Sequence, residues 1–242
     1  MPRAVLVWAV LLAAPLLAAL FAAEESAAPT LGAAPAVVFD ERIPWATPRV
    51  TGSPEPPLPY RVERVAPHLG FANPTFVVFA PDGDRVFIGE QRGRVFSFSY
   101  KSPGEKPDLA LDLTTDLTSW SARDGAKRVD ALYDLAFDPE FQDNRYIYLT
   151  YTLASLTSKP LPNGTRVSRF KLTDEQPPRI DPASEKIIIT WVEGGHNGGC
   201  LEFGRDGYLY VSTGDAATPN PPDVLATGQD CRDLLSSILR ID

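Results

Sequence analysis

A histidine within a glycine-rich run is the residue best suited to chemistry in this 242-residue sequence. His196 lies in the run 194–199, which holds four glycines and precedes an apolar stretch. Glycine lets a backbone approach a ligand closely, and an imidazole accepts a proton near neutral pH. Asp215 follows the next apolar stretch and could hold His196 in one tautomer and stabilise its charged form. The other interpretation is a histidine packed in a turn and an aspartate that ends a strand.

These two side chains meet only if the two apolar stretches form a hairpin. Residues 200–203 and 208–212 flank Asp206-Gly207, a dipeptide typical of tight hairpins because glycine reaches positive φ without steric cost. In such a hairpin the start of the first strand and the end of the second lie side by side, at the end opposite the turn. We therefore expect the histidine and the aspartate side by side.

The pattern behind this hairpin occurs three times in the sequence. Each time an apolar strand ends at a Pro, Asp or Gly turn, and a second strand rich in β-branched or aromatic residues follows. The three pairs are 75–79 with 85–89, 132–137 with 145–151, and 200–203 with 208–212. Outer strands are predicted at 94–98, 109–113, 166–170 and 186–191. Repeated four-stranded units predict an all-β fold of the β-propeller type.

The strands supply two complete blades and three strands of another, the last at 237–242. A propeller closes with about four to eight blades. About three blades alone leave a blade face and strand edges open, which soluble proteins avoid. We expect either that the chain is a fragment of a longer one or that it assembles with itself.

Two appendages precede the predicted propeller of residues 60–242. Residues 4–23 form an unbroken apolar run after Arg3, which is read as a signal peptide or as an uncleaved signal anchor within residues 1–23. Residues 24–59 are rich in proline and alanine and predict an extended linker. Either reading of the apolar run predicts export, to the periplasm or outside the cell, with membrane contact only through an uncleaved segment.

The charge balance excludes nucleic acid as the main partner. The sequence has 23 Lys and Arg against 31 Asp and Glu, a net charge of −8, whereas nucleic-acid binders carry a basic footprint. We interpret Arg123, Lys127 and Arg128 as a solvated loop, the alternative being a surface that faces an anionic ligand.

Seven residues of the third unit fit a known pattern: His196, Gly199, Asp206, Gly207, Tyr210, Gly214 and Asp215. With 135–141 and 90–95 upstream, they resemble the soluble glucose/sorbosone dehydrogenases that depend on pyrroloquinoline quinone (PQQ), whose propeller relatives include Hedgehog-interacting proteins. The resemblance covers roughly residues 70–242 and implies a six-bladed propeller of which this chain holds the N-terminal half.

The resemblance also implies an activity. The family's matching histidine removes the proton of a sugar C1 hydroxyl while hydride passes to PQQ, so His196 is the expected base, supported by Asp215. PQQ and Ca²⁺ are the implied cofactors, and the family's cationic ligands fall beyond the last residue given, so we expect the piece alone to be inactive. A small sugar or alcohol is the implied substrate, and a protein could accept the electrons.

Two departures from the family make glucose itself a doubtful substrate. Gly195 stands where glucose enzymes carry an acidic residue, and residues 128–131 (Arg-Val-Asp-Ala) stand where they carry a run resembling Gly-Gln-Gly-Gly. Both family elements touch or face the sugar.

Cys200 and Cys231 are the only cysteines in the sequence. Export permits a disulfide between them, and two separate thiols are the alternative. No metal site is expected from these cysteines, because no ligand cluster has zinc spacing.

Three functions remain open. The first is a PQQ-dependent sugar dehydrogenase, the second a non-catalytic exported propeller that binds a protein or glycan, and the third a propeller lactonase, which would need Ca²⁺ ligands at the central tunnel.

Overall fold

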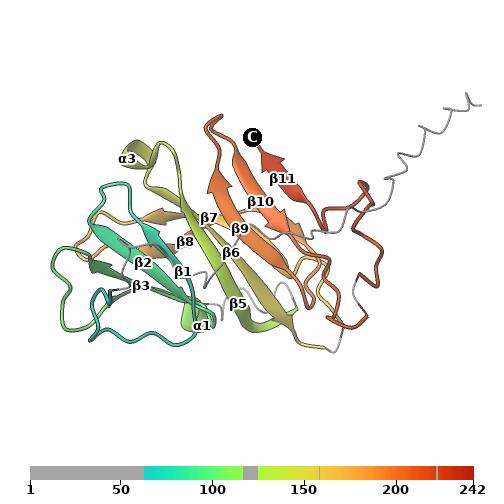
Figure 1. Ribbon diagram of the computed structural model, residues 1–242, viewed down its shortest axis with the longest axis horizontal. Coiled ribbons are helices and arrows are strands. Elements are labelled where there is room, and N and C mark those ends of the chain that lie inside the picture. The colour runs from blue at the N-terminus through green and yellow to red at the C-terminus, as the bar shows by residue number, and fades with distance from the viewer. Residues whose placement is uncertain (1–62, 117–124, 158, 222) are drawn as a thin grey trace, which may run out of the picture. The chain divides into compact units, whose positions relative to one another are not determined.

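Three antiparallel β-sheets make up the part of the chain that the computed structural model describes, residues 63–116, 125–157, 159–221 and 223–242 (Figure 1). The first sheet holds β1 (Pro74–Phe79), β2 (Arg85–Glu90), β3 (Arg94–Ser99) and β4 (Asp108–Asp112) in sequence order. The second holds β5 (Ala126–Phe137), β6 (Tyr146–Ser155), β7 (Thr165–Leu172) and β8 (Ile180–Trp191). The third has the order β11-β10-β9, with β9 (Gly198–Phe203), β10 (Leu209–Thr213) and β11 (Ile238–Ile241). The described helices α1 (Leu113–Asp116) and α3 (Phe141–Asn144) are single turns.

The hairpin that begins the third sheet follows from local sequence. In the third sheet, Gly207 takes a φ of 83°, a left-handed conformation that glycine adopts without strain. The Asp206 carboxylate beside it accepts the backbone N–H of Tyr208 at 3.2 Å. Strands β9 and β10 therefore pair as the sequence predicts, with Leu209 opposite Phe203.

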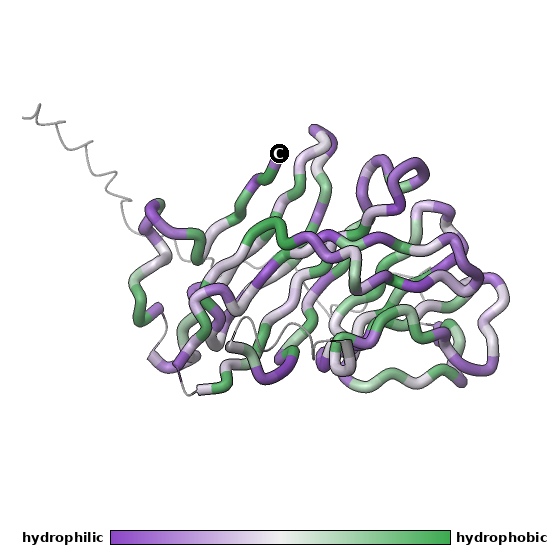
Figure 2. The backbone as a smooth tube through the Cα atoms, turned by 180° about the vertical axis from the view of Figure 1, so that it is seen from behind, coloured by the Kyte–Doolittle hydropathy of each residue, from purple (hydrophilic) through white to green (hydrophobic). Residues whose placement is uncertain are grey.

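Alternating side chains pack the sheets face to face. One buried apolar cluster lies between the first and second sheets and includes Phe87, Leu135 and Phe170. A second lies between the second and third sheets and includes Val167 and Leu201. Figure 2 shows hydrophobic and hydrophilic residues interleaved along the strands, which is the period-two pattern of a sheet with differing faces.

The first strands of the sheets adjoin one another, because β1 contacts β5 and β5 contacts β9. The Leu132 amide donates to the Gln91 carbonyl at 2.8 Å, and the Leu201 amide donates to the Asp134 carboxylate at 2.8 Å. Sheets joined at their first strands have the radial arrangement of propeller blades. The all-β, propeller-type prediction is confirmed, with two four-stranded blades and one of three described strands.

Two sequence predictions were wrong in their boundaries. Lys127 and Arg128 belong to β5 rather than to a loop: they are exposed, while Ala126 and Val129 beside them are buried. Strand β8 begins at Ile180, before the predicted 186, although Pro182 lies within it. Its pairing with β7 is irregular between Arg169 and Lys171, and such an irregularity accommodates a residue that lacks an N–H.

The predicted signal segment 1–23 and linker 24–59 lie outside the described residues, as does Arg123. Among the residues that are described, no helix has the length and apolar character needed to cross a membrane.

Candidate active site

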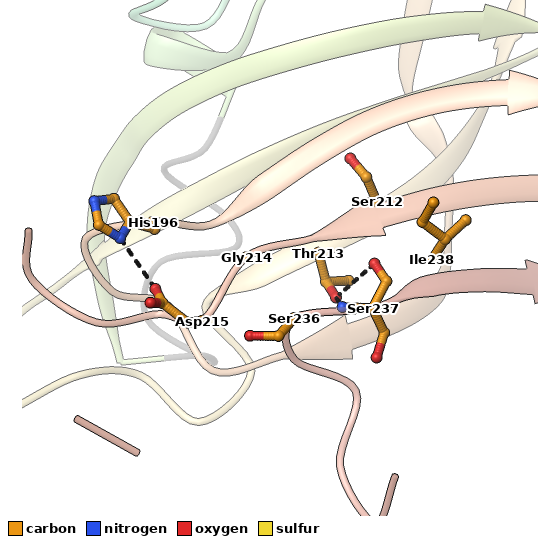
Figure 3. Close-up of a pocket in the computed structure, with 8 residues that line it drawn as sticks. All are labelled: His196, Ser212, Thr213, Gly214, Asp215, Ser236, Ser237 and Ile238. Atoms are coloured by element: carbon orange, nitrogen blue, oxygen red, sulfur yellow. Dashed lines mark hydrogen bonds and ion pairs between the residues drawn. The ribbon is translucent and has the colours of Figure 1, made fainter. Parts of the chain in front are cut away.

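His196 and Asp215 lie together at one end of the third sheet. His196 is in the loop between β8 and β9, and Asp215 follows the end of β10. Because Thr213 of β10 is paired with Gly198 of β9, both loops leave the sheet at the same end of these strands. The His196 Nδ1 atom lies 3.1 Å from Asp215 Oδ1 (Figure 3). The hairpin thus brings the two predicted residues into hydrogen-bonding contact.

Backbone pairing locks the two loops against each other. The His196 amide donates to the Ala217 carbonyl at 3.1 Å, and the Ala216 amide donates back to the His196 carbonyl at 2.9 Å. A Cβ atom on Gly195 would lie 2.2 Å from the Ala217 oxygen, and one on Gly214 would lie 2.2 Å from the His196 oxygen. The glycines around the histidine therefore allow the chain to approach itself, whereas the sequence suggested an approach to a ligand.

The Asp215 carboxylate is held as an anion. Its Oδ1 accepts the Ala217 N–H at 2.9 Å and its Oδ2 accepts the Asp223 N–H at 3.1 Å. The Ala217 N–H is the main cause that holds the pKa of Asp215 below its usual range, and the contact with His196 acts in the same direction. A carboxylate can only accept, so the proton of the shared contact belongs to His196 Nδ1.

His196 therefore presents Nε2 as its free acceptor. The side chain is 46% exposed, against 17% for Asp215, and no described residue hydrogen-bonds to Nε2. A neutral imidazole that donates from one nitrogen has a lone pair on the other. The arrangement can take up a proton at Nε2 and stabilise the resulting imidazolium with the adjacent carboxylate.

Asn197 fixes the histidine loop, and the sequence analysis did not identify it. Its side chain is buried, and its Oδ1 accepts the Gly194 N–H at 2.8 Å and the Thr165 hydroxyl at 3.1 Å. Its Nδ2 donates to the Gly194 carbonyl at 2.8 Å and to the Tyr133 hydroxyl at 3.2 Å. Tyr133 and Thr165 belong to β5 and β7, so Asn197 ties the loop to the second sheet. The only sequence signal was a polar residue directly after the histidine.

An open cavity of about 500 Å³ adjoins the pair His196 and Asp215, which we call the dyad (Figure 3). Hydroxyl side chains dominate its lining, in part from Ser236 and Ser237, which the sequence analysis also missed. The residues that line it are His196, Ser212, Thr213, Gly214, Asp215, Ser236, Ser237 and Ile238. Ser236 hydrogen-bonds to the Thr227 hydroxyl at 2.7 Å. A cavity with hydroxyls beside a proton acceptor suits a small polar molecule.

Cys200 and Cys231 are both free, exposed thiols in the structure. Of the two alternatives that the sequence left open, a disulfide or two separate thiols, the structure has the second. Burial is the main cause that raises the pKa of the Cys200 thiol, and the Asp134 carboxylate adds to it. A raised pKa disfavours the thiolate form of Cys200 at neutral pH.

Comparison with known proteins identifies the family. The family model described as glucose / sorbosone dehydrogenase matches residues 71–242. The chain belongs to this family. Among curated relatives, Hedgehog-interacting protein of Mus musculus is 28% identical over 178 residues, which is 72% of this chain and 25% of that protein. An uncharacterized protein of Synechocystis is 30% identical over 156 residues, 62% of this chain and 34% of its own length.

A solved structure supports the same fold. The PQQ-bound aldose sugar dehydrogenase from Streptomyces coelicolor matches with a TM-score of 0.53 at 19% identity, over 71% of this chain and 45% of that one. The glucose/sorbosone dehydrogenase segment described here thus spans less than half of the solved relative and about a quarter to a third of the two curated ones.

Proposed function

We propose that this chain supplies the proton-accepting half of a site that oxidises an aldose sugar or a related alcohol. The observation that carries the proposal is the His196–Asp215 contact, which leaves Nε2 of the histidine free beside a hydroxyl-lined cavity. Membership of the glucose/sorbosone dehydrogenase family supports the substrate class.

In the proposed reaction, His196 Nε2 accepts the hydroxyl proton of the substrate. The hydride on the same carbon would pass to a two-electron acceptor such as the quinone that the Streptomyces coelicolor relative binds. At C1 of a ring sugar the product is a lactone. Asp215 stays ionised, keeps Nδ1 protonated and stabilises the imidazolium as it forms. Ser236 and Ser237 line the same cavity and offer hydroxyls to a polyol.

The described residues of the cavity do not by themselves fit PQQ with Ca²⁺. PQQ is polyanionic and needs cationic side chains, yet no Lys or Arg is among the residues that line this cavity. No group of three His, Cys, Asp or Glu able to bind a metal ion occurs within the described ranges. The contribution proposed for these residues is therefore limited to binding the substrate and moving its proton.

The proposal is tested by adding an aldose to the isotope-labelled chain and following both histidines by NMR. The sequence holds only two, His68 and His196. We expect the His196 ring resonances to move with sugar concentration and those of His68 to stay fixed. In a protein that turns over sugar, His196→Ala should abolish the rate. Unchanged His196 resonances, or a wild-type rate in that variant, would contradict the proposal.

A second candidate is an exported propeller that binds a protein. It is favoured by the 28% identity to Hedgehog-interacting protein and by exposed Val224 and Leu225 in the loop between β10 and β11. Partner binding of this kind should survive His196→Ala and weaken in Leu225→Glu. The dehydrogenase proposal instead requires sugar turnover to be lost in His196→Ala and to survive Leu225→Glu.

We also propose that the chain is exported, on the apolar run of residues 4–23. Fusing residues 1–59 to a reporter that is active only outside the cytoplasm tests this, and an inactive reporter contradicts it.

A further inference from the structure

Asp223, in the loop between β10 and β11, connects the dyad to a serine that lines the cavity. Its backbone N–H donates to Asp215 Oδ2 at 3.1 Å. Its carboxylate accepts the Thr227 N–H at 2.7 Å, the Thr227 hydroxyl at 3.1 Å and the Gly228 N–H at 3.2 Å. These hydrogen bonds, with that of the Thr227 N–H first, hold the pKa of Asp223 below its usual range. The Asp223 side chain is therefore an anion that can only accept.

This anion sets the direction of the next hydrogen bond. Thr227 is 4% exposed and has one hydroxyl proton. A hydrogen bond to an ionised carboxylate is stronger than one to a neutral hydroxyl, so Thr227 donates to Asp223. The Thr227 oxygen then accepts the proton of Ser236, whose Oγ lies 2.7 Å away. Ser236 has its own proton committed in this way and presents lone pairs to the cavity that it lines.

The backbone fixes Ser236 beside the dyad. Its N–H donates to the Gly214 carbonyl at 2.9 Å, directly before Asp215 in the chain. Its φ of 51° is a left-handed conformation, which costs energy for a residue other than glycine and is kept only where the surroundings impose it. In Figure 3 the Ser236 hydroxyl points toward the side of the cavity on which Asp215 lies.

The other hydroxyls of the cavity have largely the same polarity. Ser237 and Thr213 donate their hydroxyl protons to backbone carbonyls, at 2.9 and 2.5 Å. Ser212 instead accepts a backbone N–H at 3.1 Å and remains able to donate. Of the four described hydroxyls that line the cavity, three thus have their protons committed. Together with His196 Nε2, they form a lining that chiefly accepts hydrogen bonds.

We propose that Ser236 determines specificity by accepting a second hydroxyl hydrogen from the substrate, with its polarity set by Asp223 through Thr227. The inference rests on the proposed function and narrows it: one substrate hydroxyl gives its proton to His196 Nε2 while another donates to Ser236 Oγ. The substrate is then a polyol such as an aldose, and an alcohol with a single hydroxyl is a poor one. A site built to bond a substrate O–H rejects an analogue that lacks the hydrogen.

The test uses sugars in which one hydroxyl is replaced by fluorine, which is similar in size and cannot donate. The isotope-labelled 242-residue chain is titrated with glucose, galactose and mannose, and the aldose that moves the His196 resonances furthest is chosen. Its analogues fluorinated at C2, C3, C4 or C6 are then titrated, with ¹⁹F NMR as a second readout of binding. One analogue should bind about three- to tenfold more weakly than the parent sugar, the size of one lost hydrogen bond.

Two variants assign that penalty to Ser236. In Ser236→Ala the parent sugar and the weak analogue should bind equally, because the accepting oxygen is gone. Thr227→Val keeps the size of the buried side chain and releases the Ser236 proton, so the penalty should shrink although Ser236 itself is unchanged. Thr218→Val is the matched control: it removes an exposed hydroxyl of the same loop that does not line the cavity, and should keep the wild-type penalty.

The outcomes separate this inference from the proposed function. If no aldose moves the His196 resonances, the proposed function fails and the inference fails with it. If an aldose moves them and every fluorinated analogue binds as tightly as the parent, the inference alone is wrong. A penalty that survives in Ser236→Ala would overturn the role of that serine. A full penalty in Thr227→Val would overturn the polarity assigned to it.

Discussion

Replacing Asn197 by alanine should loosen the histidine loop more than any exposed change near it. The amide makes four hydrogen bonds in a buried position, two through Oδ1 and two through Nδ2. A hydrogen bond contributes about 0.5–1.5 kcal/mol net, and partners left unsatisfied in the interior cost about 1–3 kcal/mol. Allowing for relaxation, we expect Asn197→Ala to lower the free energy of unfolding by about 2–4 kcal/mol.

Urea unfolding followed by tryptophan fluorescence measures this loss. With an m-value of about 2 kcal/mol/M, the midpoint should fall by about 1–2 M. Asn163→Ala is the control, since Asn163 is exposed and its side-chain amide accepts one hydrogen bond, from Thr190. It should change stability by less than about 0.5 kcal/mol. An Asn197→Ala loss as small as that of the control would refute the anchoring role assigned to the amide.

Three further changes probe the same architecture. Gly195→Ala forces a Cβ to 2.2 Å from the Ala217 oxygen, so it should lower the melting temperature by several degrees, while Gly70→Ala, with no atom near, should not. Asp215→Asn tests linkage: hydrogen bonds from Ala217 and His196 lower the folded pKa of Asp215, so its charge stabilises the fold above about pH 4. The stability gap between wild type and variant should therefore persist above about pH 4 and close as the pH falls below it, through the lowered folded pKa, and a gap that stays constant there would count against this linkage. Burial is the main cause that raises the pKa of Tyr148 to about 12, with the Asp138 carboxylate adding to it. The folded state then holds a proton that the unfolded state loses near pH 10, so stability should fall between about pH 10 and 12; replacing Tyr148 by Phe should flatten that fall in urea titrations.

The repeat of strands could be predicted because every strand carries its own local signal. Period-two apolar residues and the Asp206-Gly207 turn define β9 and β10 without help from the rest of the chain. Boundaries were harder, because Lys127 and Arg128 resemble a loop in isolation. They are held in β5 by pairing with β6, where Arg128 lies opposite Ala154.

The dyad could also be predicted, since one hairpin is enough to join its two residues. Asn197 could not, because its partners Thr165 and Tyr133 are 32 and 64 residues away in the sequence and on other strands. The close contacts of Gly195 and Gly214 with the chain itself could not be predicted for the same reason: the sequence indicates where a close approach is possible, and the fold determines which segments meet.

The position of the proton on each of the two imidazole rings tests the proposed pairing of His196 with Asp215. His196 should carry it on Nδ1, facing Asp215, whereas His68 Nε2 lies 2.9 Å from the Gly104 carbonyl and should carry it there. Long-range ¹H–¹⁵N spectra at about pH 9, above the usual imidazole range, distinguish the two tautomers, and His68→Gln assigns the signals. We predict opposite tautomers for the two residues and loss of the His196 preference in Asp215→Asn. An Nε2-protonated His196, or a preference that survives the loss of the carboxylate, would contradict it.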